Sequence, residues 1–495
     1  MGSSFNELPR EILERILGYL PRGRDSKFCD LRLISKRLDI IVGAIIFAKI
    51  SYSAFGRDPR DTEDDLVRMT TVLQNVKNLC FMTTKSQVFL GDPAPWPGIV
   101  DAFTQNTVNL TNLEWFHTLD GDYGPKSIEK VTHSLSSLPN LRELSLRLDS
   151  FASAELQVMQ GKQPDISFEL HLEPISNLRS LAIEWNMDRR PPPNILAQIS
   201  GVLTRSPGLE ELKIVIPHAY HLGEHYGPQV TFGEIFDATS SLPTSMKLIS
   251  LETRAVVVDG STFRRHLRHF RHLSALRIRH DPSPSAGQNI GEVFQVLASE
   301  RIELRNVHID VIHHPNVFDY LSSYSGIQEL SLKPGHPLDD SSALIRRCFE
   351  LVLPAQSSSL TSLRIGGNLR TQWSRVNTEE YLAAVAECKL LKYLCCWIWV
   401  TYAEAESRNS AVVDPWLEVV LRLPNLQRFN CPPVVLKKRS FARYEVIEEP
   451  PPGERDPDPD VRYFLEKAVF DFKWGKQMQC RVDARYREKS CVLLV

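Results

Sequence analysis

A short hydrophobic phrase, L-x-x-L-x followed by Leu, Ile, Thr or Cys, recurs along the chain and alternates apolar with polar positions. This alternation is typical of a short β-strand with one buried face. The clear copies begin at Leu141, Leu178, Leu209, Leu273, Ile327 and Leu360. Weaker copies begin at Leu79, Leu113, Leu248, Leu304, Leu391 and Leu426. Because the copies are spaced 23 to 39 residues apart, the pattern predicts about twelve strands of one kind.

Between the copies, apolar residues return at helical spacing. Clear examples are residues 194–203, 291–297, 340–351 and 378–386. One strand and one helix in roughly 30 residues resembles the leucine-rich repeat. That resemblance implies an α/β solenoid shaped like a horseshoe, in which parallel strands line the concave face and each unit packs on its neighbours.

A leucine-rich repeat has a polar residue shortly after the strand phrase, and only some copies in this chain have one. Asn186 and Asn368 occupy this position, and Asp149 and Asp281 stand there in two other copies. We therefore expect irregular repeats. A doubly wound α/β enzyme also alternates strands and helices, but it needs a glycine-rich turn between strand and helix, and the sequence contains no such turn. The repetition of one strand phrase favours the solenoid.

The first fifty residues carry a different pattern, with an apolar stripe at helical spacing. The stripe consists of Ile12, Leu13, Ile16, Leu17 and Leu20. Pro9 precedes it, where a first-turn proline is tolerated and preorganises the helix start. Two further apolar groups follow within residues 28–38 and 40–47. Three short helices cannot bury all of this surface among themselves, so we expect the following domain or a partner to cover the remainder.

Written out, this segment reads LPREILERILGYLP and, further on, LRLISKRL. It resembles the F-box, the three-helix module by which substrate receptors dock on the Skp-type adaptor of an SCF-type cullin–RING ubiquitin ligase. The resemblance covers roughly residues 5–50 and implies a set of positions on or beside the adaptor-facing surface. These are Leu8, Pro9, Ile12, Ile16, Leu20, Leu33 and Ser35. The alternative is that these helices only cap the larger domain.

Composition shifts divide the chain into five parts. We expect an F-box at 1–50, a connecting segment with the first repeat helix at 51–75, a solenoid at 76–436, an acidic proline-rich linker at 437–460, and a C-terminal helix and tail at 461–495. The helical periodicity of residues 461–474 suggests a cap for the open end of the solenoid.

Charge and cysteine content narrow the classes of partner and compartment. The chain has 58 Lys and Arg against 60 Asp and Glu, a formal charge of −2, so we expect neither a nucleic acid nor a membrane as partner. Nine scattered cysteines and a start without a signal-peptide pattern favour reduced thiols in the cytoplasm or nucleus. The apolar stretch of residues 40–50 is too short to span a bilayer.

One motif would support catalysis if its local structure allowed it. His221, Glu224 and His225 match the H-x-x-E-H phrase of a zinc hydrolase, which requires a helix that places both histidines on one face. Nearby helix breakers are Pro217, Gly223, Gly227 and Pro228. A loop between repeats is therefore expected, and the zinc hydrolase remains a remote alternative. We expect no catalytic residues, no metal and no cofactor.

A basic run and a group of cysteines are two further candidates for binding or metal chemistry. The basic run at 264–272, with its apolar residues at helical spacing, predicts an amphipathic helix with a solvated cationic outer face. The alternative is a patch for an acidic partner or a phosphate. Cys388, Cys395 and Cys396 lack the spacing of a zinc site, and the last two fall in a predicted buried strand.

The polar positions within the strand phrase are candidates for binding a protein target. They are Arg142, Glu143, Arg179, Glu210, Lys213, Arg277, Gln328, Glu329, Arg364 and Lys392. Each of them alone is typical of a solvated rim charge, so the residues that bind the target stay unknown. The resemblances together imply a non-catalytic substrate-recognition subunit, whose F-box docks the adaptor and whose solenoid binds a protein for ubiquitination. The alternative is a binding scaffold that acts outside a ligase.

Overall fold

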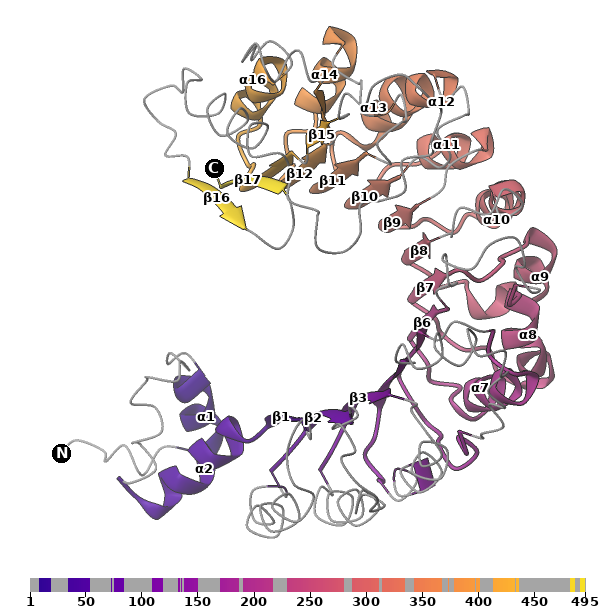
Figure 1. Ribbon diagram of the computed structural model, residues 1–495, viewed down its shortest axis with the longest axis vertical. Helices are drawn as coiled ribbons and strands as arrows, with labels where there is room; N and C mark the ends of the chain where they lie inside the picture. Colours follow the sequence, from indigo (N-terminus) through magenta and orange to yellow (C-terminus); the bar gives the residue numbers. More distant parts are fainter. Residues whose placement is uncertain are drawn as a thin grey trace, which may run out of the picture. The chain divides into compact units, whose positions relative to one another are not determined.

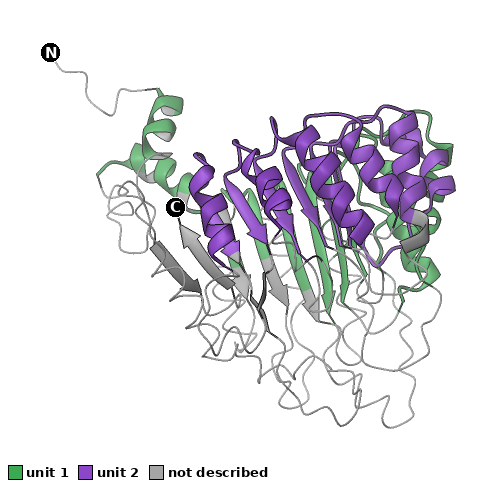
Figure 2. Cartoon of the chain, turned by 90° about the horizontal axis from the view of Figure 1, so that it is seen from above, with its two compact units in different colours: residues 1–248 green, residues 249–495 purple. Residues whose placement is uncertain are grey.

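The structure is a computed structural model of the 495-residue chain. It describes residues 9–18, 34–53, 73, 75–83, 109–118, 132–133, 135, 138–149, 170–186, 190–216, 229–279, 287–310, 314–333, 342–366, 373, 378–396, 398–400, 413–431, 433–435, 481–485 and 490–494. The chain divides into two compact units, residues 1–248 and residues 249–495, which Figure 2 colours separately. Each unit is described below by itself.

Two helices begin the first unit. Helix α1 spans Arg10–Gly18, and α2 spans Lys36–Ile46. The Ser35 hydroxyl caps α2 by accepting a hydrogen bond of 3.2 Å from the Leu38 backbone N–H. The two helices share a small core of Leu13, Leu17, Leu38, Ile41 and Val42, with Ile45 packed against it. The third predicted apolar group, residues 40–47, continues α2 and does not form a separate helix.

Six parallel strands follow in chain order, each paired with the next. They are β1 (Lys49–Ser53), β2 (Asn78–Thr83), β3 (Asn112–Thr118), β4 (Glu143–Asp149), β5 (Ser180–Asn186) and β6 (Glu211–Val215). Burial alternates along β4 and β5, as the phrase predicted, so that one face of the strands is packed and the other is partly exposed. Figure 1 shows the strands following one another from the end of α2.

The register of these strands corrects the start of the first two phrases. Leu113 lies opposite Leu144, which is the second leucine of its phrase, and Leu79 lies opposite Leu113. The first two copies therefore begin three residues earlier than expected, at the buried Val76 and Leu110. Strand β1 is an additional copy that the sequence did not reveal, because it has Ile and Tyr where the phrase has leucines.

Helices cover one face of the strands in the first unit. Helix α7 (Pro193–Arg205) buries six residues, and α8 (Phe232–Phe236) continues into the 3-10 helix η3 (Asp237–Ser241). Helix α8 begins with a reciprocal capping box between Thr231 and Glu234. Its two phenylalanines are stacked with ring centroids 4.2 Å apart. Figure 1 shows α7 and α8 on one face of the strands. Among the described residues no helix packs on the other face, which is called the uncovered face.

The second unit repeats the arrangement. Its parallel strands are β7 (Ser250–Arg254), β8 (Ala275–Arg279), β9 (Asn306–Ile309), β10 (Glu329–Leu332), β11 (Ser362–Ile365), β12 (Tyr393–Cys396) and β14 (Arg428–Cys431). The connecting helices are α9 (Gly260–Arg265), α10 (Gly287–Ser299), α11 (Pro315–Ser322), α12 (Ser342–Arg347), α13 (Leu353–Gln356), α14 (Glu379–Ala386) and α16 (Asp414–Arg422). All of these helices lie on one face of the strands (Figure 2).

Shorter elements complete the second unit. The 3-10 helix η4 (Leu267–His269) follows α9, and the π-helix η5 (Cys348–Val352) joins α12 to α13. Strands β13 (Ile398–Val400) and β15 (Pro433–Val435) form a separate parallel pair. The C-terminal tail forms a hairpin, β16 (Arg481–Arg485) and β17 (Ser490–Leu494), and β17 pairs antiparallel with β14. This hairpin covers the edge of β14, where an exposed strand would invite pairing with another chain.

The α/β fold class with parallel strands and connecting helices is thus confirmed, and the arrangement is compatible with a repeat solenoid. The four helical patterns predicted between the phrases coincide with α7, α10, α12 with η5, and α14. The expected helix at 461–474 and the linker at 437–460 lie outside the described residues. No helix in the described parts of the chain is long and apolar enough to cross a membrane.

The basic run at 264–272 departs from its prediction. It forms the end of α9 and the short η4, not one continuous amphipathic helix. Its apolar residues Phe263, Leu267 and Phe270 are buried as expected. However, His266 and His269 are buried as well, with 1% and 0% of their surface exposed, so the cationic outer face consists of arginines and His272.

Candidate functional site

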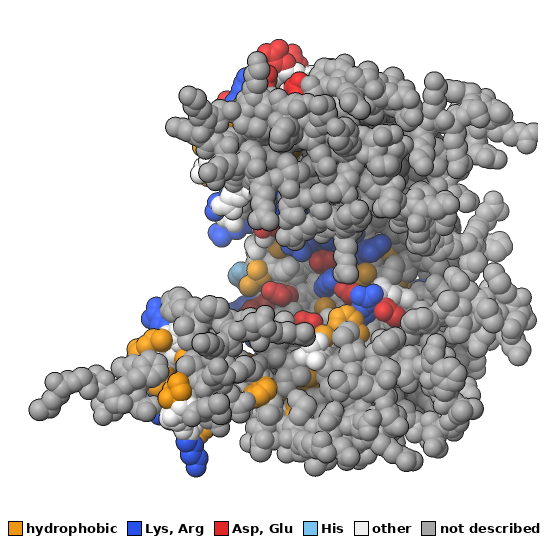
Figure 3. All heavy atoms as spheres, turned by 60° about the vertical axis from the view of Figure 1, so that its left-hand side comes forward, with side chains coloured by type: hydrophobic (Ala, Val, Ile, Leu, Met, Phe, Trp, Pro, Cys, Tyr) orange, Lys and Arg blue, Asp and Glu red, His pale blue; other side chains and the backbone are white. Residues whose placement is uncertain are grey.

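Four isoleucines on and beside α1 and α2 leave an unusual amount of apolar surface exposed. We call them the isoleucine surface: Ile12, Ile16, Ile34 and Ile40, which are 44%, 39%, 64% and 56% exposed. They make up half of the eight large hydrophobic residues that are exposed in the described parts of the chain. Exposed apolar residues on and beside two packed helices make this a candidate binding surface. Figure 3 shows hydrophobic side chains gathered at the lower left, where Figure 1 places these helices.

The apolar stripe of α1 therefore divides into two rows. Leu13 and Leu17, one helical turn apart, are buried against α2. Ile12 and Ile16 form a second, parallel row that the α1–α2 core does not cover. The same geometry explains the exposure of Ile40 on α2. Leu38, Ile41 and Ile45 are spaced to share one face of the helix, and Ile40 lies outside that face.

The other predicted adaptor-facing residues can be placed in part. Pro9 is exposed, and its carbonyl accepts hydrogen bonds of 3.1 Å from the N–H groups of Ile12 and Leu13, so it begins α1 as expected. Ser35 is the half-buried N-cap of α2, and its hydroxyl is engaged in that cap. Leu8, Leu20 and Leu33 lie outside the described residues. The F-box resemblance did not assign Ile34 and Ile40 to the adaptor-facing surface, and helical spacing alone does not say which face a second element covers.

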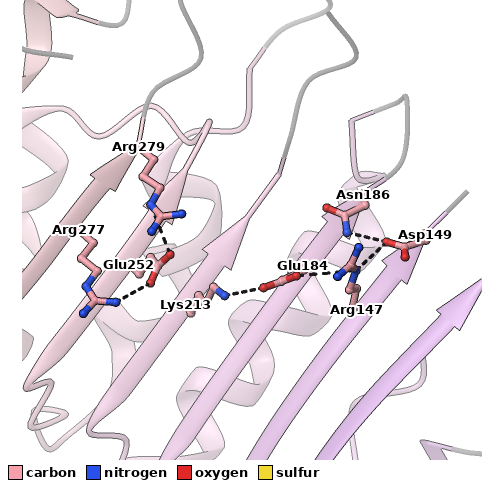
Figure 4. Close-up of polar contacts among 8 residues, drawn as sticks. All are labelled: Arg147, Asp149, Glu184, Asn186, Lys213, Glu252, Arg277 and Arg279. Atoms are coloured by element: carbon pink, nitrogen blue, oxygen red, sulfur yellow. Dashed lines mark hydrogen bonds and ion pairs between the residues drawn. The ribbon is translucent and has the colours of Figure 1, made fainter. Parts of the chain in front are cut away.

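The uncovered face of the first unit carries a network of charged and amide side chains. The Lys213 ammonium lies 2.5 Å from the Glu184 carboxylate, and Arg147 lies 4.0 Å from the same group. Arg147 also pairs with Asp149 at 3.1 Å. The Asn186 amide donates to Asp149 at 2.6 Å, so two of the positions expected to form a polar ladder do bond across β4 and β5. Figure 4 shows these side chains on one face of the strands.

The uncovered face of the second unit has a similar chemistry with different partners. Arg277 and Arg279 both approach Glu252, at 3.6 and 3.8 Å (Figure 4). The His308 ring lies 2.7 Å from Asp310, which also lies 3.9 Å from the Lys333 ammonium. Burial raises the pKa of Asp310, but the hydrogen bond with His308 and the charges of Lys333, His308 and Arg279 outweigh it, so the pKa is lowered overall.

The ten polar residues singled out within the strand phrase fall into two groups. Glu143, Lys213, Arg277, Glu329 and Arg364 lie on the strands, at positions that alternate with the buried ones. Arg142, Arg179, Glu210, Gln328 and Lys392 instead precede the strands, where their backbone groups join one turn to the next. The pair of Arg179 and Glu210 at 2.8 Å is a solvated contact between such turns. Only the first group belongs to the uncovered face.

The described residues also bear on the candidate metal and thiol chemistry. No group of three or more His, Cys, Asp or Glu side chains in these ranges could hold a metal ion. His221, Glu224 and His225 lie outside them. Cys395 and Cys396 are buried in β12 as predicted. Burial also raises the pKa of Cys388 to about 12, which keeps that thiol protonated at neutral pH.

No protein-family model matches the chain, and no curated protein matches it. What the chain can do must therefore be judged from its surfaces. The described residues present two of them: an apolar one on α1 and α2, and a charged one on the uncovered faces of the strands. Both are suited to binding other proteins.

Proposed function

We propose that the chain is the substrate-recognition subunit of an SCF-type cullin–RING ubiquitin ligase. In this proposal α1 and α2 belong to an F-box that docks the Skp-type adaptor, and the leucine-rich repeats bind a target protein. The observation that carries the proposal is the isoleucine surface. Three of its four residues, Ile12, Ile16 and Ile34, fall within the phrases LPREILERILGYLP and LRLISKRL. Ile12 and Ile16 are among the residues that the F-box resemblance assigned to the adaptor.

The exposure of these isoleucines gives the docking step its physical basis. Full burial of an isoleucine is worth about 1.5–3 kcal/mol, so covering side chains that are roughly half exposed would contribute about 1 kcal/mol each. The buried core of Leu13, Leu17 and their neighbours holds the two helices together before the adaptor binds. The apolar surface is thus preformed, so the free energy of binding is not reduced by a cost of folding these helices.

The repeated strands support the second half of the proposal. All twelve phrases found in the sequence fall on consecutive parallel strands, and within each unit equivalent leucines pair across neighbouring strands. This is the arrangement expected of leucine-rich repeats. A receptor of this kind acts by bridging, because a target held on the repeats experiences a high effective concentration of the ubiquitin-charged enzyme.

A binding scaffold without ligase activity is the second candidate. It is favoured by the direct connection between α2 and the sheet, since β1 begins three residues after α2 ends and pairs with β2. Helices joined so closely to the first strand would also serve as an N-terminal cap. Under this reading the isoleucine surface would bind some other protein or none.

Affinity capture from cells distinguishes the two candidates. The full chain, and a variant with Ile12→Asp and Ile16→Asp, would be captured in parallel and the bound proteins identified by mass spectrometry. The ligase proposal expects adaptor and cullin with the wild type and neither with the variant. Leu421→Asp, which changes a residue of α16 with a similar exposed fraction of 41%, serves as the matched control. If the wild-type chain captured no adaptor, the ligase proposal would be refuted.

A further inference from the structure

The uncovered face of the second unit carries more basic than acidic side chains. We call it the cationic face and define it by the charged residues at the outward positions of β7 to β14. Its basic residues are Arg254, Arg277, Arg279, Lys333, Arg364 and Arg428. Its acidic residues are Glu252, Asp310 and Glu329. His308 adds a further group that can become positive.

The equivalent face of the first unit has the opposite balance. On β3 to β6 its acidic residues are Glu114, Glu143, Asp149, Glu184 and Glu211, and its basic residues are Arg147 and Lys213. The formal charge of the whole chain is only −2, so the cationic face is a local feature and not a reflection of composition. The first unit therefore supplies an internal comparison for any test of the second.

Ion pairs within the cationic face do not neutralise it. Arg277 and Arg279 share the single carboxylate of Glu252, whose side chain is only 12% exposed. Lys333 shares Asp310 with His308. One carboxylate for the two guanidinium groups of Arg277 and Arg279 leaves positive potential on the surface, where an anion can approach it.

Arg364 has a buried polar atom that the surrounding residues leave unpaired. Its Nε atom is buried and has no hydrogen-bond partner in the described residues, and the same holds for the hydroxyl of Ser331. The two residues are directly opposite each other on β10 and β11. A buried donor without a partner costs about 1–3 kcal/mol, which an incoming acceptor would recover. Because both residues as a whole are only half-buried, an anionic group can approach this polar position from solvent.

Arg428 extends this position toward the end of the sheet. Its guanidinium carbon lies 5.6 Å from the centroid of the Tyr393 ring, on the strand next to it. Tyr393 and Cys395 separate Arg428 from Arg364 along the sheet. At a strand spacing of about 4.8 Å, the Cα atoms of the two arginines are about 12 Å apart. An extended peptide covers that distance in about four residues.

We propose that the cationic face binds an acidic, extended segment of the target protein, with carboxylates three or four residues apart placed over Arg364 and Arg428. This inference deepens the proposed function, because it rests on the repeats being the part that holds the target. Charge complementarity of this kind sets specificity and association rate and weakens as salt is added.

The test uses fluorescence anisotropy with the full chain and a labelled peptide of four Glu-Gly-Gly repeats. The same peptide with glutamine in place of glutamate, and one with phosphoserine in place of glutamate, are the comparison probes. We expect the glutamate peptide to bind, the glutamine peptide to bind at least about tenfold more weakly, and the affinity of the former to fall as salt rises. Binding of the phosphoserine peptide alone would overturn the choice of carboxylates.

Paired variants locate the site. Arg364→Glu and Arg428→Glu should each reduce affinity for the glutamate peptide by at least about fivefold, since the proposal places a carboxylate over each of these arginines. Arg147→Glu is the matched control on the first unit, because its guanidinium lies 5.7 Å from the Phe116 ring, as that of Arg428 lies 5.6 Å from the Tyr393 ring. Circular dichroism verifies that each variant is folded. An equal loss in the control would mean non-specific attraction and would refute the proposal.

The peptide-binding result can be separated from binding of the adaptor. The variants on the cationic face should bind the Skp-type adaptor as the wild type does, because they lie in the other unit of the chain. A chain that binds the glutamate peptide but not the adaptor would defeat the ligase proposal and keep this one. A chain that binds the adaptor but not the glutamate peptide would refute the acidic-segment proposal and leave the ligase proposal standing.

Discussion

At the scale of single residues, Gln356 shows how one buried polar side chain organises the backbone of a neighbouring turn. Its amide nitrogen donates to the carbonyls of Leu321 and Tyr324 at 2.8 and 2.5 Å. Its amide oxygen accepts from the N–H groups of Gly326 and Ile327, both at 3.0 Å. Gly326 has a φ of +126°, which a side chain would strain, so the turn needs both the glycine and the glutamine.

Replacing Gln356 with leucine should therefore be costly although the volume is similar. Four backbone groups, two of them buried and two half-buried, would lose their partner, and the free energy of unfolding should fall by about 3 kcal/mol. Urea unfolding followed by circular dichroism measures this. Gln328→Leu changes an exposed glutamine of the neighbouring turn and should have almost no effect. A loss of stability as large in Gln328→Leu would show that the buried amide is not the cause.

Asp310 makes the stability of the second unit depend on pH in a defined direction. Its lowered pKa means that the ionised form stabilises the fold. This contribution is present above the ordinary aspartate pKa of about 3.9 and is lost as the pH falls through the lower pKa of the folded state.

Asp310→Asn should consequently destabilise the chain at pH 6, and the difference from the wild type should shrink between pH 4 and pH 3. Urea unfolding at each pH measures both free energies. Glu329→Gln, an exposed change on the next strand, is the control and should show no such trend. A difference that grows on acidification would mean that the charged form of Asp310 does not stabilise the fold.

The residue scale is also where sequence reasoning was least complete. The start of α1 at Pro9 and the burial of Cys395 could be predicted from local patterns. The exposure of Ile34 and Ile40 and the burial of His266 and His269 could not, because these depend on which neighbouring element packs against each face. Helical spacing states which residues share a face, but a second element decides which face is covered.

At the scale of elements, α1 and α2 separate a buried row of apolar residues from an exposed one. Leu17 is 1% exposed in the shared core, while Ile16, its neighbour in sequence, is 39% exposed. Two substitutions to alanine can therefore test each row separately. Removing a buried leucine side chain costs about 2–5 kcal/mol, which a core of five residues cannot absorb.

We expect Leu17→Ala to abolish the hydrogen-exchange protection of α1, and Ile16→Ala to leave it unchanged. Both variants should lose affinity for the adaptor, the first because the helices separate and the second because part of the isoleucine surface is missing. Hydrogen exchange measured by mass spectrometry resolves this segment. Loss of protection in Ile16→Ala would contradict the division into two rows.

Strands and helices were predicted well from the sequence where the hydrophobic phrase is clear, and poorly where other residues replace its leucines. The clear phrases fall on β4 to β6, β8, β10 and β11, and the helices between them were found with small errors at their ends. The copies on β2 and β3 were placed three residues late, because each has a second apolar residue at a matching offset. Strand β1 has Ile and Tyr in place of the leucines, and the hairpin of β16 and β17 carries no phrase, so only their pairing identifies them.

At the scale of the molecule, the proposed function requires two surfaces with different chemistry. The isoleucine surface is apolar and belongs to the first unit, while the cationic face belongs to the second. A receptor gains from this difference, because an adaptor that recognises apolar surface and a target that recognises positive charge do not compete. The sequence indicated both halves of this division through its motifs, but the charge contrast between the two sheet faces emerged only with the strand positions.

The most direct test of the account is the affinity of the purified full-length chain for a purified Skp-type adaptor, measured by isothermal titration calorimetry. We predict a dissociation constant of about 1 μM or lower for the wild type, and an increase of at least about 100-fold for the variant with Ile12→Asp and Ile16→Asp. Leu421→Asp should bind as the wild type does. No binding by the wild type, or equal binding by both variants, would contradict the claim that the isoleucine surface docks the adaptor.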